Sequence, residues 1–374
     1  MSASKNKVSI IIGDSWKATN LVITSGARPP VIKVHNNLDQ ARTLHEHLGD
    51  DTIIIVRMIG GENIINRGKQ PATNAVEWCT ALEPAFRACT WAYFEVGGPL
   101  APVDEWQRDF WLAGMNWMHA RGYKAVVMTH GEGNPQVPSG GGDGWGVMWP
   151  VVQMAAAYRY ILGPQAYWID GNMDPGDDWH MFRIYRAFRE YPGKWPQGTR
   201  IVFTESGIDL RNGLGWRAAL GGNWQRYRAG LKLMSEEIKR RPCPPGVEVI
   251  GATSFAIHEI PNMWDDFNYL EHLPDQLADI KAEQDSIIEV PQEEEPVPLP
   301  APSGTVAIQT LSTTGQNVRQ THSLLAPIVS SLEYGEIAYT SNTDSATVGQ
   351  PNSWVYIKAP RGEGWAAAWL LKEA

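Results

Sequence analysis

Residues 200–209 read RIVFTESGID. The three consecutive apolar residues at 201–203 predict a buried strand, and Glu205 follows where that strand should end. A carboxylate beside a core strand costs free energy unless a partner or a reaction requires it. Glu205 is therefore the first candidate functional residue.

Seven other short runs share the β-branched, apolar character of this strand, and helical patterns separate most of them. The runs are VSIII (8–12), VIKV (31–34), TIIIV (52–56), WAYFEV (91–96), KAVVM (124–128), AYWI (166–169) and VIGATSFAI (249–257). Continuous apolar strands that alternate with helices indicate a parallel sheet covered by helices. Eight such strands before residue 285 predict the α/β class and a (β/α)8 TIM barrel over 1–284. A doubly wound open sheet is the alternative, but no Gly-x-Gly-x-x-Gly turn follows the first run.

The composition is that of a soluble globular protein, and it narrows the possible partners. A net charge of −9 argues against nucleic acid or an anionic membrane surface as the main partner, and no run has the roughly 18 apolar residues of a membrane span. The N-terminus has no signal-peptide h-region or cleavage site, so we expect either no signal or one missing from this sequence. The 17 tryptophans favour a carbohydrate ligand, because the indole ring suits stacking on sugar faces. The three cysteines are predicted to be buried thiols.

A second, smaller domain is predicted after an acidic, proline-rich linker at 285–303. Residues 304–374 contain short alternating strands and turn residues, which indicate a small all-β barrel. The motifs NVR (317–319), WVYI (354–357) and GWAAAWL (364–370) resemble a bacterial SH3-like domain. That resemblance implies possible binding to the bacterial cell wall and favours an extracellular or wall-associated location.

Polar and aromatic residues gather where the predicted barrel strands end. In a TIM barrel the active site lies at the C-terminal ends of the strands. Glu95 ends the fourth strand and Glu205 the seventh. The other candidates, predicted to bind substrate, are His35, Arg57, His130, Glu132, Trp168, Asp170, Asn172, His258 and Trp264.

Two carboxylates across a barrel mouth fit hydrolysis of a glycosidic bond, in which one protonates the leaving oxygen and the other attacks the anomeric carbon. The segments IVFTESGID (201–209) and YFEVGGP (93–99) resemble the strand-7 and strand-4 segments of the 4/7 superfamily of retaining glycoside hydrolases. The resemblance implies that Glu205 is the nucleophile and Glu95 the general acid/base, and it implies no cofactor.

The fourth strand departs from this family's Asn-Glu-Pro motif. In one alignment Glu95 is the acid/base and Phe94 replaces the asparagine; in the other, Glu95 is an earlier glutamate and Gly97-Gly98 replace the catalytic pair. The second alignment would leave Glu205 without a partner unless Glu132 or Asp170 takes the role. Glu205 itself could instead form a structural salt bridge with Arg57 or Arg183.

Three further features of the sequence bear on the site. The histidines have no metal-binding spacing, so no metal is expected, although the acidic turn at 170–178 could hold a structural calcium. The glycine-rich stretch 138–149 is predicted to be a flexible lid or a plain surface loop, and Trp16 and Trp145 are expected near the strand ends.

The leading hypothesis is a retaining glycoside hydrolase acting on a polysaccharide or oligosaccharide. The alternatives are a non-catalytic carbohydrate-binding barrel that has lost its acid/base, and a phage-lysin-type hydrolase of cell-wall glycans. The barrel fold alone does not separate them, because it hosts many chemistries.

Overall fold

The computed structural model describes residues 5–97, 103–131, 134–210, 213–259 and 264–285 of the first part of the chain. In the second part it describes 305–310, 316–320, 328–332, 337–341, 348, 350, 353–359, 362–368 and 371–373. The chain divides into two compact units, 1–288 and 289–374. The predicted linker at 285–303 lies outside the described residues, except for Asp285.

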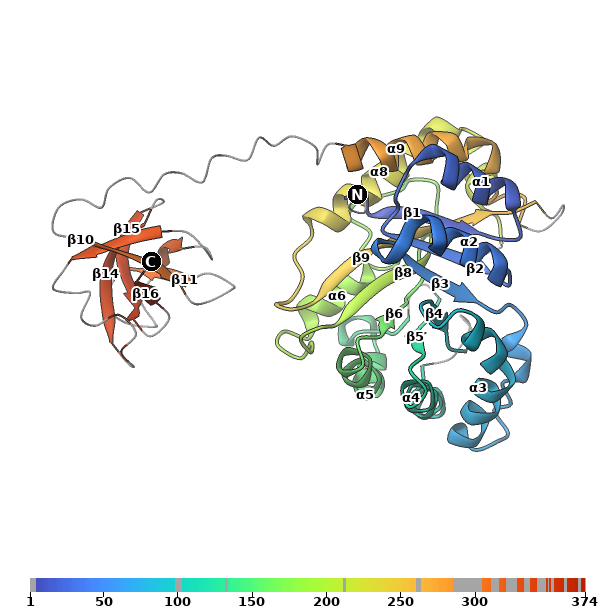
Figure 1. Ribbon diagram of the computed structural model, residues 1–374, viewed down its shortest axis with the longest axis horizontal. Coiled ribbons are helices and arrows are strands. Elements are labelled where there is room, and N and C mark those ends of the chain that lie inside the picture. Colours follow the sequence, from blue (N-terminus) through green and yellow to red (C-terminus); the bar gives the residue numbers. More distant parts are fainter. Residues whose placement is uncertain are drawn as a thin grey trace. The chain divides into compact units, whose positions relative to one another are not determined.

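The first unit is a closed parallel barrel, as the sequence predicts (Figure 1). Neighbouring strands pair in the order β6-β5-β4-β3-β2-β1-β9-β8-β7, and an additional pairing of β6 with β8 closes the ring. The strands are β1 (Val8–Ile12), β2 (Val31–His35), β3 (Ile53–Arg57), β4 (Tyr93–Glu95), β5 (Lys124–Val127), β6 (Ile161–Leu162), β7 (Ala166–Trp168), β8 (Arg200–Ile208) and β9 (Glu248–Ile257).

The sixth barrel strand is divided into β6 and β7, so the seventh and eighth strands of the barrel are β8 and β9. Gly163 and Pro164 cause the division, because proline has no N–H to donate to a neighbouring strand. Below this break β6 pairs with β5 and β8, whereas β7 pairs with the end of β8 at Ser206–Ile208. The predicted strand at 166–169 is therefore only the upper half of the sixth strand.

Helices cover the outside of the barrel (Figure 1). They are α1 (Trp16–Ser25), α2 (Leu38–Leu48), α3 (Pro71–Ala88), α4 (Glu105–His119), α5 (Gly144–Ala157), α6 (Arg183–Glu190), α7 (Trp216–Leu220), α8 (Trp224–Arg240) and α9 (Leu273–Asp285). Polar side chains cap several N-termini: Asn37 accepts a hydrogen bond from the Gln40 N–H, and Asp104 accepts one from the Gln107 N–H. These caps begin α2 and α4 immediately after the strand-end loops.

The barrel interior has an apolar floor. Val31, Ile55, Val126, Ile161, Val202 and Ile250, one from each of six strands, form a separate buried cluster. Side chains two residues apart on a strand share a face, so Lys33 and Arg57, which follow Val31 and Ile55, also point inward. This periodicity places a polar layer directly above the apolar floor, on the C-terminal side of the barrel.

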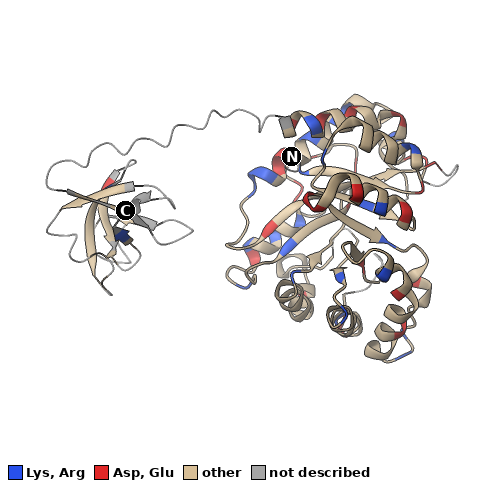
Figure 2. Ribbon diagram, in the orientation of Figure 1, with Lys and Arg blue, Asp and Glu red and all other residues tan. Residues whose placement is uncertain are grey.

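Acidic and basic residues are mixed over the outer helices (Figure 2). Among the described residues, no helix is long and apolar enough to span a membrane. Cys79 and Cys89 are buried free thiols, as predicted, and Cys243 is half-buried. Most of the tryptophans contribute to packing rather than to a surface; Trp78, Trp111, Trp168 and Trp216 are fully buried.

The described residues of the second unit form antiparallel strands, in the order β12-β11-β15-β14-β13-β10-β16. They are β10 (Thr305–Thr310), β11 (Gln316–Arg319), β12 (Ile328–Leu332), β13 (Ile337–Ser341), β14 (Trp354–Ala359), β15 (Gly362–Ala367) and β16 (Leu371–Glu373). Ile308, Val318, Ala338, Val355 and Ile357 are among the residues of its small core.

Candidate active site

Glu205 lies inside the barrel near the end of β8, at a shift in register between β8 and β9. Its Oε1 is 2.8 Å from Lys33 Nζ and 2.6 Å from an Arg57 guanidinium nitrogen. Its Oε2 accepts hydrogen bonds from Gln165 Nε2 at 2.8 Å and from the Tyr167 hydroxyl at 3.2 Å. Four donors, from β2, β3 and residues 165–167, therefore hold both carboxylate oxygens.

These donors determine the ionisation of Glu205. Burial alone would raise the pKa of Glu205, but the positive charges of Lys33 and Arg57 outweigh it and lower the pKa to about 2. Burial and the adjacent carboxylate raise the pKa of Tyr167 well above its usual value, so this hydroxyl remains a proton donor. Glu205 is consequently a carboxylate at physiological pH.

Glu95 also faces the barrel interior. Its neighbour Phe94 points outward and packs edge-on against Phe86 of α3, with ring centroids 4.7 Å apart, so strand alternation turns Glu95 inward. Glu95 Oε1 is 2.8 Å from Lys33 Nζ, Oε2 is 3.9 Å from Arg57 Nε, and the side chain is 2% exposed. Because Lys33 Nζ contacts both carboxylates, the two contacting oxygens are no further apart than twice 2.8 Å.

This upper limit on the oxygen-to-oxygen distance can be compared with the carboxyl separations of retaining and inverting glycosidases. Retaining glycosidases hold their carboxyl groups about 5–5.5 Å apart, and inverting ones about 6.5–9.5 Å apart. The upper limit on the distance between the contacting oxygens of Glu95 and Glu205 is compatible with the first range and lies below the second.

Three residues of this cluster were missed from the sequence: Lys33, Gln165 and Tyr167. The sequence does indicate that Lys33 is unusual, because a lysine in the middle of the apolar run VIKV must either point outward or have buried partners. The indication for Tyr167 is weaker: it is adjacent to Trp168 on the same strand, so if one of the two rings points inward the other points outward.

Trp168, predicted to bind substrate, faces the other way. Its ring is buried against Phe182, with a centroid distance of 6.4 Å, and its indole N–H donates to the Asp174 carbonyl. Because adjacent strand residues point to opposite faces, Tyr167 takes the inward position and Trp168 packs against the outer layer. The expectation that Trp168 lines the site is corrected in favour of Tyr167.

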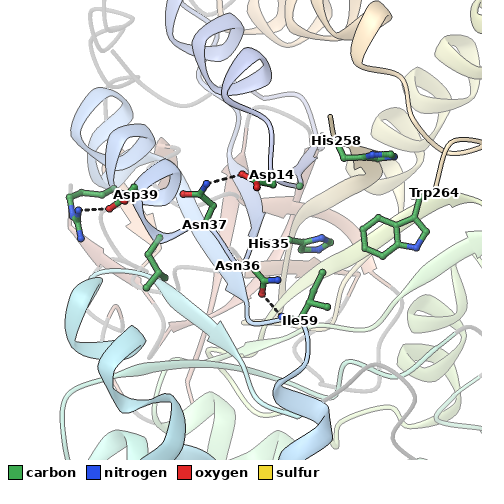
Figure 3. A pocket seen from close by; sticks show the side chains of 11 residues that line it. Asp14, His35, Asn36, Asn37, Asp39, Ile59, His258 and Trp264 are labelled. Atoms are coloured by element: carbon green, nitrogen blue, oxygen red, sulfur yellow. Dashed lines mark hydrogen bonds and ion pairs between the residues drawn. The ribbon is translucent and has the colours of Figure 1, made fainter. Parts of the chain in front are cut away.

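A pocket of about 530 Å³ opens beside this cluster, at the C-terminal ends of β1, β2 and β9 (Figure 3). Three predicted substrate-binding residues line it, namely His35, His258 and Trp264. The remaining lining residues are Gly13, Asp14, Asn36, Asn37, Leu38, Asp39, Arg42 and Ile59. His35 also interacts electrostatically with Glu205 and so connects the pocket to the carboxylates.

His35 lies deep in this pocket, and its ring faces Trp264 edge-on, with centroids 5.8 Å apart (Figure 3). Burial and the positive charge of Lys33 hold the pKa of His35 well below its usual value, so the ring is neutral at pH 7. Neither ring nitrogen has a hydrogen-bond partner among the described residues. A neutral imidazole offers one donor and one acceptor, which is the combination that a hydroxyl group satisfies.

His130 is buried in the interior, and its ring lies edge-on to Trp111 with centroids 4.9 Å apart. Arg183 does not reach Glu205; it donates instead to the carbonyls of His130 and Gly131 and fixes the chain after β5. Of the two structural salt-bridge partners considered for Glu205, only Arg57 is therefore present. Glu132, predicted to contact substrate, lies outside the described residues.

Asp170 and Asn172 are exposed and bond to each other. Asp170 Oδ1 accepts from the Asn172 backbone N–H at 3.0 Å, and Oδ2 accepts from its side-chain amide at 3.1 Å. This is a self-contained turn. In the part of the chain that the structure describes, no three His, Cys, Asp or Glu side chains are grouped as a metal site.

The glycine-rich stretch 138–149 is not a lid. Asp143 caps α5 by accepting a hydrogen bond from the Gly146 N–H, so residues 144–149 form the first turns of this helix. Trp145 is buried against Trp195, with centroids 5.1 Å apart, and so belongs to the packing beneath α5. Trp16 is 45% exposed at the start of α1 and does not line the pocket.

Among known proteins, solved structures resemble the chain in fold, at low sequence identity. No protein-family model and no curated protein matches the chain. Solved structures similar to it include the catalytic domain of a family 26 endo-β-1,4-mannanase from Bacillus sp. JAMB-750 (12% identity, 75% of this chain and 86% of that one, TM-score 0.45). Others are a family 39 glycoside hydrolase from Bacteroides cellulosilyticus WH2 (10%, 98% and 80%, TM-score 0.46) and a β-1,3-glucanase of Cryptomeria japonica pollen (15%, 70% and 94%, TM-score 0.43). At this similarity the comparisons carry no argument about activity, which is argued from the site itself.

Proposed function

We propose that the chain is a glycoside hydrolase that cleaves glycosidic bonds with retention of configuration, with Glu205 as the nucleophile and Glu95 as the general acid/base. The observation that carries the proposal is the pair of carboxylates on β4 and β8, bridged by Lys33 at 2.8 Å from each. Their spacing suits a retaining pair, and Glu205 is held ionised.

The reaction would proceed in two steps. In the first, an oxygen of Glu205 bonds to the anomeric carbon while the glycosidic C–O bond breaks, and the leaving oxygen takes the proton of Glu95. In the second, water attacks the same carbon and gives a proton to Glu95, and the ester bond to Glu205 breaks. The second step returns the proton to Glu95 and frees the Glu205 carboxylate, so both groups are regenerated and no cofactor is required.

The pocket around His35 is the proposed site for a sugar unit of the substrate. Its charged lining residues favour a neutral sugar: Asp39 is ion-paired with Arg42 at 2.8 Å, whereas Asp14 accepts only an amide hydrogen bond from Asn37 in the described part of the chain. The excess negative charge disfavours uronic acids. We therefore propose a neutral polysaccharide or oligosaccharide as the substrate class.

Replacing His35 with Leu should raise KM about tenfold and change kcat less, because the variant removes a hydrogen-bonding side chain that contacts a sugar hydroxyl. His47→Leu, at an exposed position on α2, is the matched control and should leave KM unchanged. Steady-state kinetics on the best substrate measures both. An unchanged KM in His35→Leu would show that the sugar binds elsewhere.

The proposed activity is tested by incubating the full chain with neutral mannans, β-glucans, xylans and their oligosaccharides. Product release is followed by chromatography, and the anomer formed first is followed by NMR. Release of products with retained configuration supports the proposal. Release with inverted configuration, or no release from any glycan, overturns it.

One observation favours a second candidate, a carbohydrate-binding barrel without turnover. The Glu95 side chain is 2% exposed, so a leaving oxygen has to reach deep into the barrel to take its proton. Calorimetric binding of an oligosaccharide that remains intact would identify this function.

For the C-terminal unit we propose an SH3-like domain over 304–374, joined by the linker 285–303 to a barrel over 1–284. Its described antiparallel strands and small apolar core support this assignment. Bacterial cell wall is its proposed partner, and a pull-down of the full chain with purified peptidoglycan tests it.

A further inference from the structure

Lys33 is the least expected residue of the barrel interior. It lies in the middle of β2 with its side chain 0% exposed, directly above the apolar floor. Burying an ammonium ion costs several kcal/mol unless strong partners compensate. The position would hold a valine or isoleucine if packing alone decided it, so its partners indicate its role.

Those partners are the two proposed catalytic carboxylates. Lys33 Nζ lies 2.8 Å from Glu95 Oε1 and 2.8 Å from Glu205 Oε1. Arg57 favours Glu205, at 2.6 Å, over Glu95, at 3.9 Å. Of the two cations, Lys33 is therefore the one equally distant from an oxygen of each carboxyl group, although only the Glu205 oxygen accepts a hydrogen bond from it.

The proposed reaction moves a negative charge between these same two groups. When Glu205 forms the ester it loses its charge, and Glu95 becomes a carboxylate as its proton leaves with the glycosidic oxygen. The second step reverses this movement. An ammonium ion in contact with both groups stabilises either arrangement without moving, and a preorganised charge of this kind lowers a barrier most in a water-poor site.

We propose that Lys33 is a positioning residue that serves as a shared counter-ion, stabilising the negative charge on Glu205 before the first step and on Glu95 after it. The inference rests on the proposed glycosidase function. It goes beyond that function by predicting that one buried cation assists both steps of the reaction.

The electrostatics of Glu205 support this role. Of the interactions that lower the pKa of Glu205, the charge of Lys33 is the largest, followed by that of Arg57, and the hydrogen bond from Lys33 adds to them. Gln165 and Tyr167 complete the surroundings from β7 and the residue before it. Removing Lys33 leaves Arg57 as the nearest charge and should raise the pKa of Glu205.

The test uses Lys33→Met, which keeps the length of the side chain and removes its charge. Lys124→Met is the matched control: Lys124 is a half-buried barrel lysine on β5 whose ammonium donates to the Trp91 carbonyl. The value of kcat/KM on an unactivated oligosaccharide reports ester formation with proton transfer from Glu95. The value of kcat on a dinitrophenyl glycoside, whose leaving group needs no proton, reports ester hydrolysis. We expect both rates to fall about 100-fold in Lys33→Met, the acid limb of kcat/KM to move to higher pH, and Lys124→Met to match the wild type.

A loss confined to one step would overturn the shared role, as would a folded Lys33→Met with wild-type rates and pH profile. If Lys33→Met does not fold, the proposal can still be tested with the wild-type chain, in which a 2-deoxy-2-fluoro glycoside traps the ester on Glu205. Its crystal structure should show Lys33 Nζ bonded to Glu95 beside the esterified Glu205, and a Lys33 that has left Glu95 would overturn the proposal. Wild-type protein that neither turns over nor traps any glycoside would instead refute the glycosidase function.

Discussion

Glu205→Gln is expected to lower kcat on the order of 10⁴-fold, the size of effect seen when a catalytic carboxylate is removed from a hydrolase. Glutamine keeps the shape of the side chain but cannot form the ester with the anomeric carbon. The carboxylate that it replaces accepts from Lys33, Arg57, Gln165 and Tyr167, so the reacting oxygen is already held in place.

The measurement is hydrolysis of an activated aryl glycoside by wild type and variant. Glu248→Gln, at the exposed start of β9, carries the same chemical change away from the site and should retain full activity. Circular dichroism and the melting temperature establish that Glu205→Gln is folded. If the folded variant keeps a kcat within tenfold of the wild-type value, Glu205 is not the nucleophile.

The second large effect is on stability at acid pH. The pKa of Glu205 is lowered in the folded protein to about 2 from an unperturbed 4.5. A depressed folded-state pKa contributes stability that is present above the unfolded value and is lost as the pH falls through the folded value. The ionised Glu205 should therefore contribute roughly 3 kcal/mol above pH 4.5, and this contribution should disappear as the pH falls from 4.5 toward 2.

Urea unfolding of the full chain, followed by tryptophan fluorescence, measures this dependence. The wild type should lose more unfolding free energy than Glu205→Gln between pH 5 and pH 2.5, because the variant has no carboxyl group at this position. Parallel pH dependences of the two proteins would mean that Lys33 and Arg57 do not stabilise the ionised form.

The barrel could be predicted from the sequence because each strand carries its own local signal. Runs such as TIIIV at 52–56 are apolar on both faces, which is typical of strands in a helix-covered parallel sheet. Glu95 and Glu205 become candidate residues for the same reason, since each follows such a run.

The composition of the inner layer could not be predicted in the same way. Lys33 meets Glu205 across 172 residues of sequence, and its strand pattern gives its direction but not its partners. Trp168 and Tyr167 are adjacent aromatic residues, and strand alternation requires one of them to point inward without determining which. The glycine-rich composition of 138–149 predicts a loop, but Asp143 caps α5 there and residues 144–149 are helical.

The charges of the inner layer have a consequence for how related chains can differ. Lys33 and Arg57 are two basic side chains that contact the carboxyl groups of Glu95 and Glu205 within one buried volume. Removing one of these four groups would leave a buried partner without its compensating group, at a cost of several kcal/mol. Evolutionary substitutions at these four positions should therefore occur together. An aligned set of relatives should show acidic and basic members changing together, so that a chain with an apolar residue at position 33 has also lost a carboxylate. Independent variation of the four positions would show that this layer tolerates an unbalanced charge.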